Sequence, residues 1–151
     1  MIDLERLRLD LENDEGCIKE VYLDHLGYPT FGIGHLIKDT DPEYGCEVGQ
    51  NITDERVAEA FEDDIQITYN DCLRLYPDFD MLPNEVQLII ANMMFNLGAT
   101  RMGKFRGMKA GVDARDWQRA ADEMVDSLWY KQVTNRADRL VKRMRALGEK
   151  A

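Results

Sequence analysis

The chain has 151 residues, 44% of them hydrophobic, which is enough for one domain with its own core. Its formal net charge of −10 argues against a nucleic-acid partner, because affinity for phosphate backbones comes from clustered Lys and Arg side chains. No apolar run reaches the roughly 18 residues that a membrane span requires, so membrane insertion is not expected.

The first predicted helix covers residues 3–14, where leucines recur at helical spacing. Gly16 follows at a position typical of a helix stop, which puts Glu15 at the C-terminal end of this helix.

Two short antiparallel strands are predicted next. Residues 21–23 and 28–33 are β-branched and aromatic, and residues 24–27 between them read as a turn. Asp24 then ends the first strand and Thr30 lies on the returning strand, so we expect both side chains to face one cleft.

Residues 38–51 form a long predicted loop. Its acidic residues suggest a calcium loop, but Tyr44 stands where the sharp-turn glycine belongs, so we reject that interpretation. A long helix is predicted from Thr53 to residue 76, with Thr53 as N-cap and with Ile52 and Val57 placed as a hydrophobic staple.

The remaining chain is predicted to be helical. Residues 84–97 are apolar nearly all round, which is typical of a buried helix, and the pattern ends at Gly98. Two amphipathic helices follow, one around Trp117 to Leu128 and one around Ala137 to Leu147. The predicted fold class is α+β, mostly α, with a small sheet near the N-terminus.

Three cysteines, Cys17, Cys46 and Cys72, lack the spacing of a zinc site, and their odd number does not suggest a closed disulfide framework. We expect reduced thiols, with Cys17 packed rather than nucleophilic. The N-terminus is charged from its third residue, so we expect no signal peptide and synthesis in the cytoplasm.

Glu15 and Asp24 supply the two carboxyl groups that hydrolysis of a glycosidic bond needs, one to protonate the leaving oxygen and one to act as base or nucleophile. The pair alone is weak evidence, because the chain has 29 acidic residues and such spacings arise by chance. The residues around the pair strengthen the hypothesis.

Five stretches in order resemble the phage-type lysozymes, the glycoside hydrolase family of the T-even bacteriophage endolysins. The similarity covers nearly the whole chain, and one stretch alone would be weak. The stretches are Asp14-Glu15-Gly16, Tyr22-x-Asp24, the run from Gly27 to Leu36, the run from Asn92 to Gly98, and the run from Trp129 to Ala137.

The resemblance implies specific roles. Glu15 matches the catalytic acid, Asp24 the second catalytic carboxylate and Thr30 the hydroxyl that places the attacking water. Leu36 and Phe95 match substrate-contacting positions. The residues expected to support the site are Arg136, which matches a residue near the catalytic glutamate, together with His35 and Asn96.

The implied fold is a single lysozyme domain in two lobes. Residues 15–52 form the mixed lobe, residues 53–76 the connecting helix, and residues 77–151 with helix 3–14 the helical lobe. Two polar positions that help bind the glycan in the family appear here as Met108 and Glu123, so sugar recognition there is expected to differ.

The implied reaction is hydrolysis of the β-1,4 bond between N-acetylmuramic acid and N-acetylglucosamine in peptidoglycan, with inversion and without a cofactor. Two alternatives stay open: a catalytically silent peptidoglycan-binding module, which has no need of all three catalytic residues, and a lytic transglycosylase. We expect a monomer that binds peptidoglycan glycan strands, accumulates in the host cytoplasm, and reaches the wall in the periplasm through a separate pore-former.

His35 is interpreted as structural rather than as a metal ligand or base, since His25 is the one other histidine in the sequence. Asp64, on the predicted long helix, is the expected partner. The Gly32-x-Gly34 pair lacks the third glycine of a nucleotide loop and is read instead as close strand packing.

Overall fold

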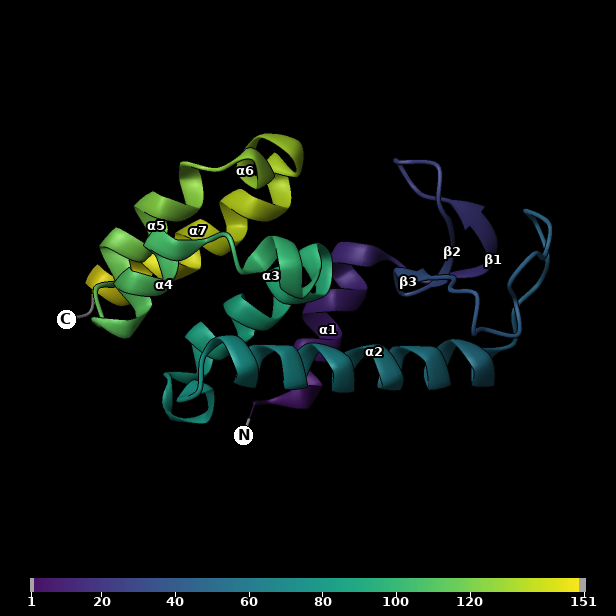
Figure 1. Ribbon diagram of the computed structural model, residues 1–151, viewed down its shortest axis with the longest axis horizontal. Helices are drawn as coiled ribbons and strands as arrows, with labels where there is room; N and C mark the ends of the chain where they lie inside the picture. Colours follow the sequence, from purple (N-terminus) through teal and green to yellow (C-terminus); the bar gives the residue numbers. More distant parts are fainter. Residues whose placement is uncertain (1, 150–151) are drawn as a thin grey trace. The chain divides into compact units, whose positions relative to one another are not determined.

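Helices make up most of the computed structural model, which describes residues 2–149, and a small three-stranded antiparallel sheet lies near the N-terminus (Figure 1). The predicted fold class is therefore confirmed. The helices are α1 (Leu4–Glu15), α2 (Asp54–Leu75), α3 (Asn84–Met102), α4 (Arg106–Asp113), α5 (Trp117–Val125), α6 (Leu128–Gln132) and α7 (Thr134–Glu149), with a 3₁₀ turn η1 (Phe79–Met81).

The chain divides into two compact units, and the division falls inside α2. Leu4–Asn70 form the sheet unit, and residues 71–149 with residues 2 and 3 form the helical unit. Helix α1 groups with the sheet by its contacts, whereas the resemblance places residues 3–14 in the helical lobe, and that lobe assignment stays a prediction. One physical reason for this grouping is that Arg8 on α1 pairs with Glu62 on α2, within the same unit.

The sheet has the order β1-β2-β3, with strands Ile18–Leu23, Pro29–Gly32 and His35–Leu36. Strand β3 was not predicted, because two residues are too few to show an alternating pattern. The loop after β3 returns along the other edge of β1, where the Val21 N–H donates to the Gln50 carbonyl (2.9 Å) and the Gly49 N–H donates to the Val21 carbonyl (2.8 Å).

Helix α2 begins as predicted. The Thr53 hydroxyl accepts a hydrogen bond from the Arg56 N–H (3.1 Å), and Ile52 and Val57 are both buried. A Cβ added at Gly32 would lie 3.1 Å from Cγ1 of Val57, so the helix packs on bare backbone of β2. The interpretation of Gly32 as a close-packing glycine is confirmed.

In the helical unit, α3 is buried along most of its length and breaks at Gly98, whose φ of 80° is not helical. The predicted stop at Gly98 is therefore a kink. Helices α4 and α6 were not predicted. A Cβ added at Gly111 would lie 2.7 Å from the backbone nitrogen of Ala120, so this glycine lets α4 and α5 pack closely.

The cysteines differ in their surroundings. Cys72 is buried, and burial raises the pKa of its thiol to about 12. The expectation of a packed Cys17 was wrong: Cys17 is exposed, because it lies where the chain passes from α1 to β1. Cys46, on the 38–51 loop, is exposed as well. Within residues 2–149 no helix has the length and apolar character to cross a membrane.

Candidate active site

Glu15 is the last residue of α1 and is partly buried. Its carboxylate lies against the turn between β2 and β3, since a Cβ added at Gly34 would fall 2.5 Å from Oε2 of Glu15. Gly34 has a φ of +62°, so the absence of a side chain there serves both the backbone turn and the space that the carboxylate occupies. The second glycine of the Gly32-x-Gly34 pair is thus also a close-packing residue.

Asp24 follows the last residue of β1 and organises the turn into β2. Its Oδ1 accepts hydrogen bonds from the backbone N–H of Leu26 (2.9 Å) and of Tyr28 (2.8 Å). Its own N–H donates to the Tyr28 carbonyl (2.9 Å). Within residues 2–149 Oδ2 makes no hydrogen bond, so the turn orients the carboxylate while one oxygen stays available as an acceptor.

Thr30 lies on the middle strand, and its side chain is almost completely buried, with 3% exposed. It pairs in register with Tyr22 on β1 and with Leu36 on β3, so these three side chains share one face of the sheet. The Thr30 hydroxyl donates to the Tyr28 carbonyl (2.9 Å). Leu36 is 46% exposed on this face.

The charges of both predicted catalytic carboxylates affect the pKa of the Tyr22 phenol. The pKa of Tyr22 is raised, first by burial and then by the charges of Glu15 and Asp24. Electrostatic effects of this kind fall off with distance, so the two carboxylates and the Tyr22 side chain belong to one region of the sheet unit. We predicted that Glu15, Asp24 and Thr30 lie close together, and this geometry agrees with that prediction. Their catalytic roles stay predictions.

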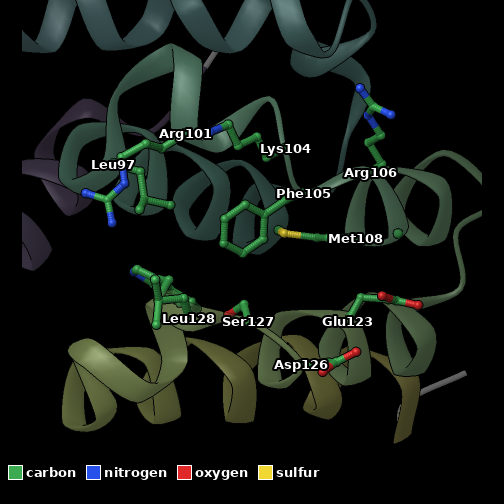
Figure 2. A pocket seen from close by; sticks show the side chains of 12 residues that line it. Leu97, Arg101, Lys104, Phe105, Arg106, Met108, Glu123, Asp126, Ser127 and Leu128 are labelled. Atoms are coloured by element: carbon green, nitrogen blue, oxygen red, sulfur yellow. The ribbon is translucent and has the colours of Figure 1, made fainter.

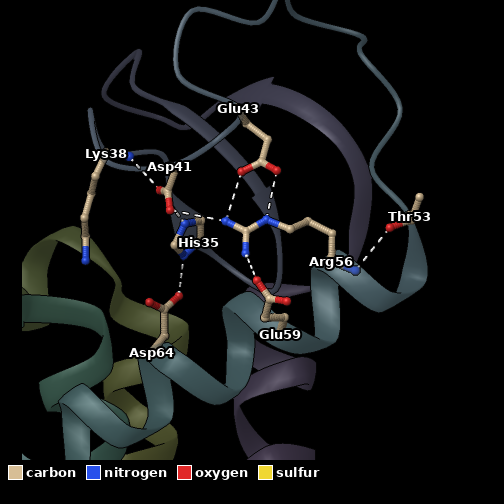
Figure 3. A network of polar contacts seen from close by, with 8 residues as sticks. All are labelled: His35, Lys38, Asp41, Glu43, Thr53, Arg56, Glu59 and Asp64. Carbon is tan, nitrogen blue, oxygen red and sulfur yellow. Dashed lines mark hydrogen bonds and ion pairs between the residues drawn. The ribbon is translucent and has the colours of Figure 1, made fainter.

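His35 lies on the opposite face of the sheet, where it is buried and bonded to side chains around it (Figure 3). Its Nδ1 lies 2.7 Å from Oδ2 of Asp64, so the predicted partner is confirmed, and its Nε2 lies 2.8 Å from Oδ2 of Asp41. Burial alone would lower the pKa of His35, but the hydrogen bonds and charges of Asp64 and Asp41 outweigh it and raise that pKa.

Arg56 extends this network and was not foreseen from the sequence. Its guanidinium bonds both carboxylate oxygens of Glu43 (2.8 and 3.0 Å), and it also contacts Asp41 (3.2 Å) and Glu59 (2.7 Å). Its centre lies 5.6 Å from the centroid of the Phe31 ring. The acidic residues of the 38–51 loop therefore hold that loop to α2 (Figure 3).

The predicted residues of the helical unit form their own contacts. Arg136 is buried and its Nε donates to Oδ1 of Asn92 (2.9 Å). Asn96 accepts a hydrogen bond from Nε1 of Trp129 (2.9 Å), while Phe95 is partly exposed beside it on α3. The roles of Arg136, Asn96 and Phe95 toward Glu15 and a glycan stay predictions.

The helical unit also contains a pocket of about 350 Å³ (Figure 2). Phe105 and Met108 are apolar residues of its lining. Figure 2 shows the side chains of Arg101, Lys104 and Arg106 on one side of the pocket and those of Glu123 and Asp126 on the other. The lining includes both departures noted from the sequence, Met108 and Glu123; the charged members are Arg101, Lys104, Arg106, Glu123 and Asp126.

Comparisons with known proteins point in one direction. The family model described as phage lysozyme matches residues 12–146. The pre-baseplate central spike protein Gp5 of Enterobacteria phage T4 is 34% identical over 148 residues, which cover 86% of this chain and 26% of the spike protein.

Two further relatives carry enzyme names. The probable T4-type lysozyme 2 of Dictyostelium discoideum is 29% identical, over 87% of this chain and 88% of that protein. The peptidoglycan hydrolase gp36 of Pseudomonas phage phiKMV is 28% identical, over 94% of this chain and 15% of that protein. The chain thus spans most of the Dictyostelium protein and only a part of each phage protein.

Proposed function

The chain belongs to the phage lysozyme family, and from this membership we propose that it is a muramidase that hydrolyses the β-1,4 bond between N-acetylmuramic acid and N-acetylglucosamine in bacterial peptidoglycan. The relatives named lysozyme and peptidoglycan hydrolase support a lysozyme-type glycoside hydrolase. The observation that carries the finer proposal is that Glu15 packs against the turn after β2 and Asp24 organises the turn before β2, so the two carboxylates lie at the two ends of the strand that holds Thr30.

In the proposed reaction Glu15 is the acid. Its carboxyl group protonates the glycosidic oxygen while the bond to the anomeric carbon breaks, so that the leaving sugar departs as a neutral alcohol. The packing of Glu15 against the Gly34 backbone supports this role, because a proton donor must be held in a defined place to reach one oxygen of the substrate.

Asp24 and Thr30 prepare the water. Because the Thr30 hydroxyl gives its proton to the Tyr28 carbonyl, it offers lone pairs to a water O–H. The second O–H of that water points to Oδ2 of Asp24, which takes the proton as the water oxygen attacks the anomeric carbon. A single displacement of this kind inverts the configuration at that carbon.

Glu15→Gln is the decisive variant, because it removes the transferable proton while keeping the shape of the side chain. We expect it to fold and to lose lysis of outer-membrane-permeabilised Gram-negative cells. Glu12→Gln is the matched control, an exposed glutamate on the same helix, and it should lyse cells as the wild type does. Wild-type protein that never lyses cells across pH and salt would instead favour a silent peptidoglycan-binding module.

Product analysis tests the bond and the mechanism. New reducing ends on N-acetylmuramic acid and an α-anomer as the first product in NMR are expected for inverting hydrolysis. Anhydro-muramic ends would indicate a lytic transglycosylase, and a β-anomer would indicate retention.

In the cell we assign this activity to host lysis, by a monomer that reaches the wall through a separate pore-former. Expression in a Gram-negative cytoplasm tests this assignment. Lysis is expected when a pore-forming protein is co-expressed and absent without it, and lysis by the enzyme alone would contradict the need for a pore-former.

A further inference from the structure

The register of the sheet places Tyr22 beside the proposed catalytic residues. The pairing of β1 with β2 shifts between Ile18 and Tyr22, and such bulges turn the side chains that follow them. Val21 is fully buried on one face, whereas Tyr22, the next residue, lies partly exposed on the face shared with Thr30. Asp24 follows two residues later, at the end of the same strand.

The Tyr22 hydroxyl has no hydrogen-bond partner among residues 2–149. Burial and the neighbouring charges of Glu15 and Asp24 raise the pKa of this phenol, so it keeps its proton through the neutral range. The site therefore contains an O–H donor that the fold itself leaves unused.

The other polar groups of the site cannot fill this position. Ionised Asp24 is an acceptor, and the Thr30 hydroxyl proton is already given to the Tyr28 carbonyl. In the proposed reaction the proton of Glu15 goes to the glycosidic oxygen. A bound saccharide brings hydroxyl, ring and N-acetyl oxygens, and all of these accept hydrogen bonds.

We propose that Tyr22 donates a hydrogen bond to the saccharide held between Glu15 and Asp24 and so positions it for cleavage. This inference rests on the proposed function, since it assigns Tyr22 to the same bound glycan. Tyr22 is a substrate-positioning residue here, with no proton transfer of its own.

Tyr22→Phe removes the hydroxyl and keeps the ring. We expect kcat/KM for a soluble peptidoglycan tetrasaccharide to fall about three- to tenfold, the effect of one neutral hydrogen bond. The pH values at which activity rises and falls should stay where they are. Tyr44→Phe is the control, because Tyr44 is 65% exposed on the 38–51 loop, and its activity should be unchanged.

Binding is measured separately from turnover in Glu15→Gln protein, which holds the uncleaved tetrasaccharide. Adding Tyr22→Phe should weaken binding by the same three- to tenfold factor. In protein with intact Tyr22 and ¹³Cζ-labelled tyrosine, the Tyr22 resonance should shift on saccharide binding while that of Tyr44 stays. This NMR readout needs no Tyr22 variant, so it holds even where Tyr22→Phe fails to fold.

The inference would be overturned if Tyr22→Phe left both kcat/KM and saccharide binding unchanged, or if the Tyr22 resonance did not shift when the saccharide binds. It would also be overturned if Tyr22→Phe lost activity, still bound the saccharide, and showed a shift in the pH values at which activity rises and falls. The last result would mean that Tyr22 acts through the carboxylates. If the wild type cleaves the tetrasaccharide and Glu15→Gln does not, these results would contradict the role of Tyr22 but leave the proposed function standing. A wild type that neither cleaves nor binds would remove the proposed function with it.

Discussion

Gly34 offers a direct test of whether Glu15 must stay where the structure places it. Gly34→Ala changes two things at once. A non-glycine residue at a φ of +62° costs about 1–2 kcal/mol of stability in the left-handed region. The new Cβ would also lie 2.5 Å from Oε2 and 2.9 Å from Cδ of Glu15.

The second effect should appear in activity rather than in stability. Ordinary contacts lie near ~3.5 Å, so the Glu15 carboxylate has to move by about 1 Å. The far end of the flexible Glu15 side chain moves at little cost in free energy. The loss of stability should therefore stay close to the cost of placing alanine at a positive φ. A misplacement of about 1 Å in a catalytic group can cost on the order of 100-fold in rate, or about 2.7 kcal/mol in the transition state.

Gly45→Ala is the matched control, because Gly45 has a φ of +84° and an added Cβ there meets no atom within 4 Å. Urea unfolding should show similar stability losses for the two variants. Initial rates of reducing-end release should show the ~100-fold loss of kcat/KM in Gly34→Ala alone. Equal activity of the two variants would refute the placement of Glu15 against Gly34 as a condition for catalysis.

Three further outcomes are expected. His35→Asn should lower the free energy of unfolding by about 3 kcal/mol near pH 5. Because the pKa of His35 is raised in the folded state, its stabilisation is complete below about pH 6.5 and is lost as pH rises through the folded-state value. The difference in the free energy of unfolding between variant and wild type, measured with urea, should therefore be smaller at pH 9 than at pH 5. A difference that does not change with pH would contradict this. Arg56→Met leaves the Glu43 carboxylate without this cation and removes one of the two partners of Asp41, and it should cost about 3 kcal/mol. Arg74→Met removes a guanidinium that is mostly exposed to solvent and pairs with Asp71 on the same helix, so it should cost less than about 1 kcal/mol, and thermal melts compare the two variants. The net charge of −10 opposes approach to an anionic wall, so lysis rates should stay flat or rise as NaCl is raised toward ~0.15 M, and a steep fall would count against this reasoning.

Local sequence patterns predicted much of the fold. Hydrophobic spacing predicted α1, α2 and the buried α3, and Thr53 caps α2 as its residue type indicated. Asp24 organises the turn between β1 and β2 through its own backbone neighbours. These features follow from sequence because the interactions that form them join residues only a few positions apart.

Tertiary contacts decided the rest. Short strand β3 exists through its pairing with β2, and Gly111 allows α4 to pack closely on α5. Asp64 was found from the sequence as a partner of His35, but Asp41 and Glu43, which pair with His35 and Arg56, come from a loop whose path no local pattern predicts. The placement of Tyr22 likewise depends on strand register. These features depend on strand register, on helix packing and on the path of the 38–51 loop, and the spacing of residues along the chain does not encode them.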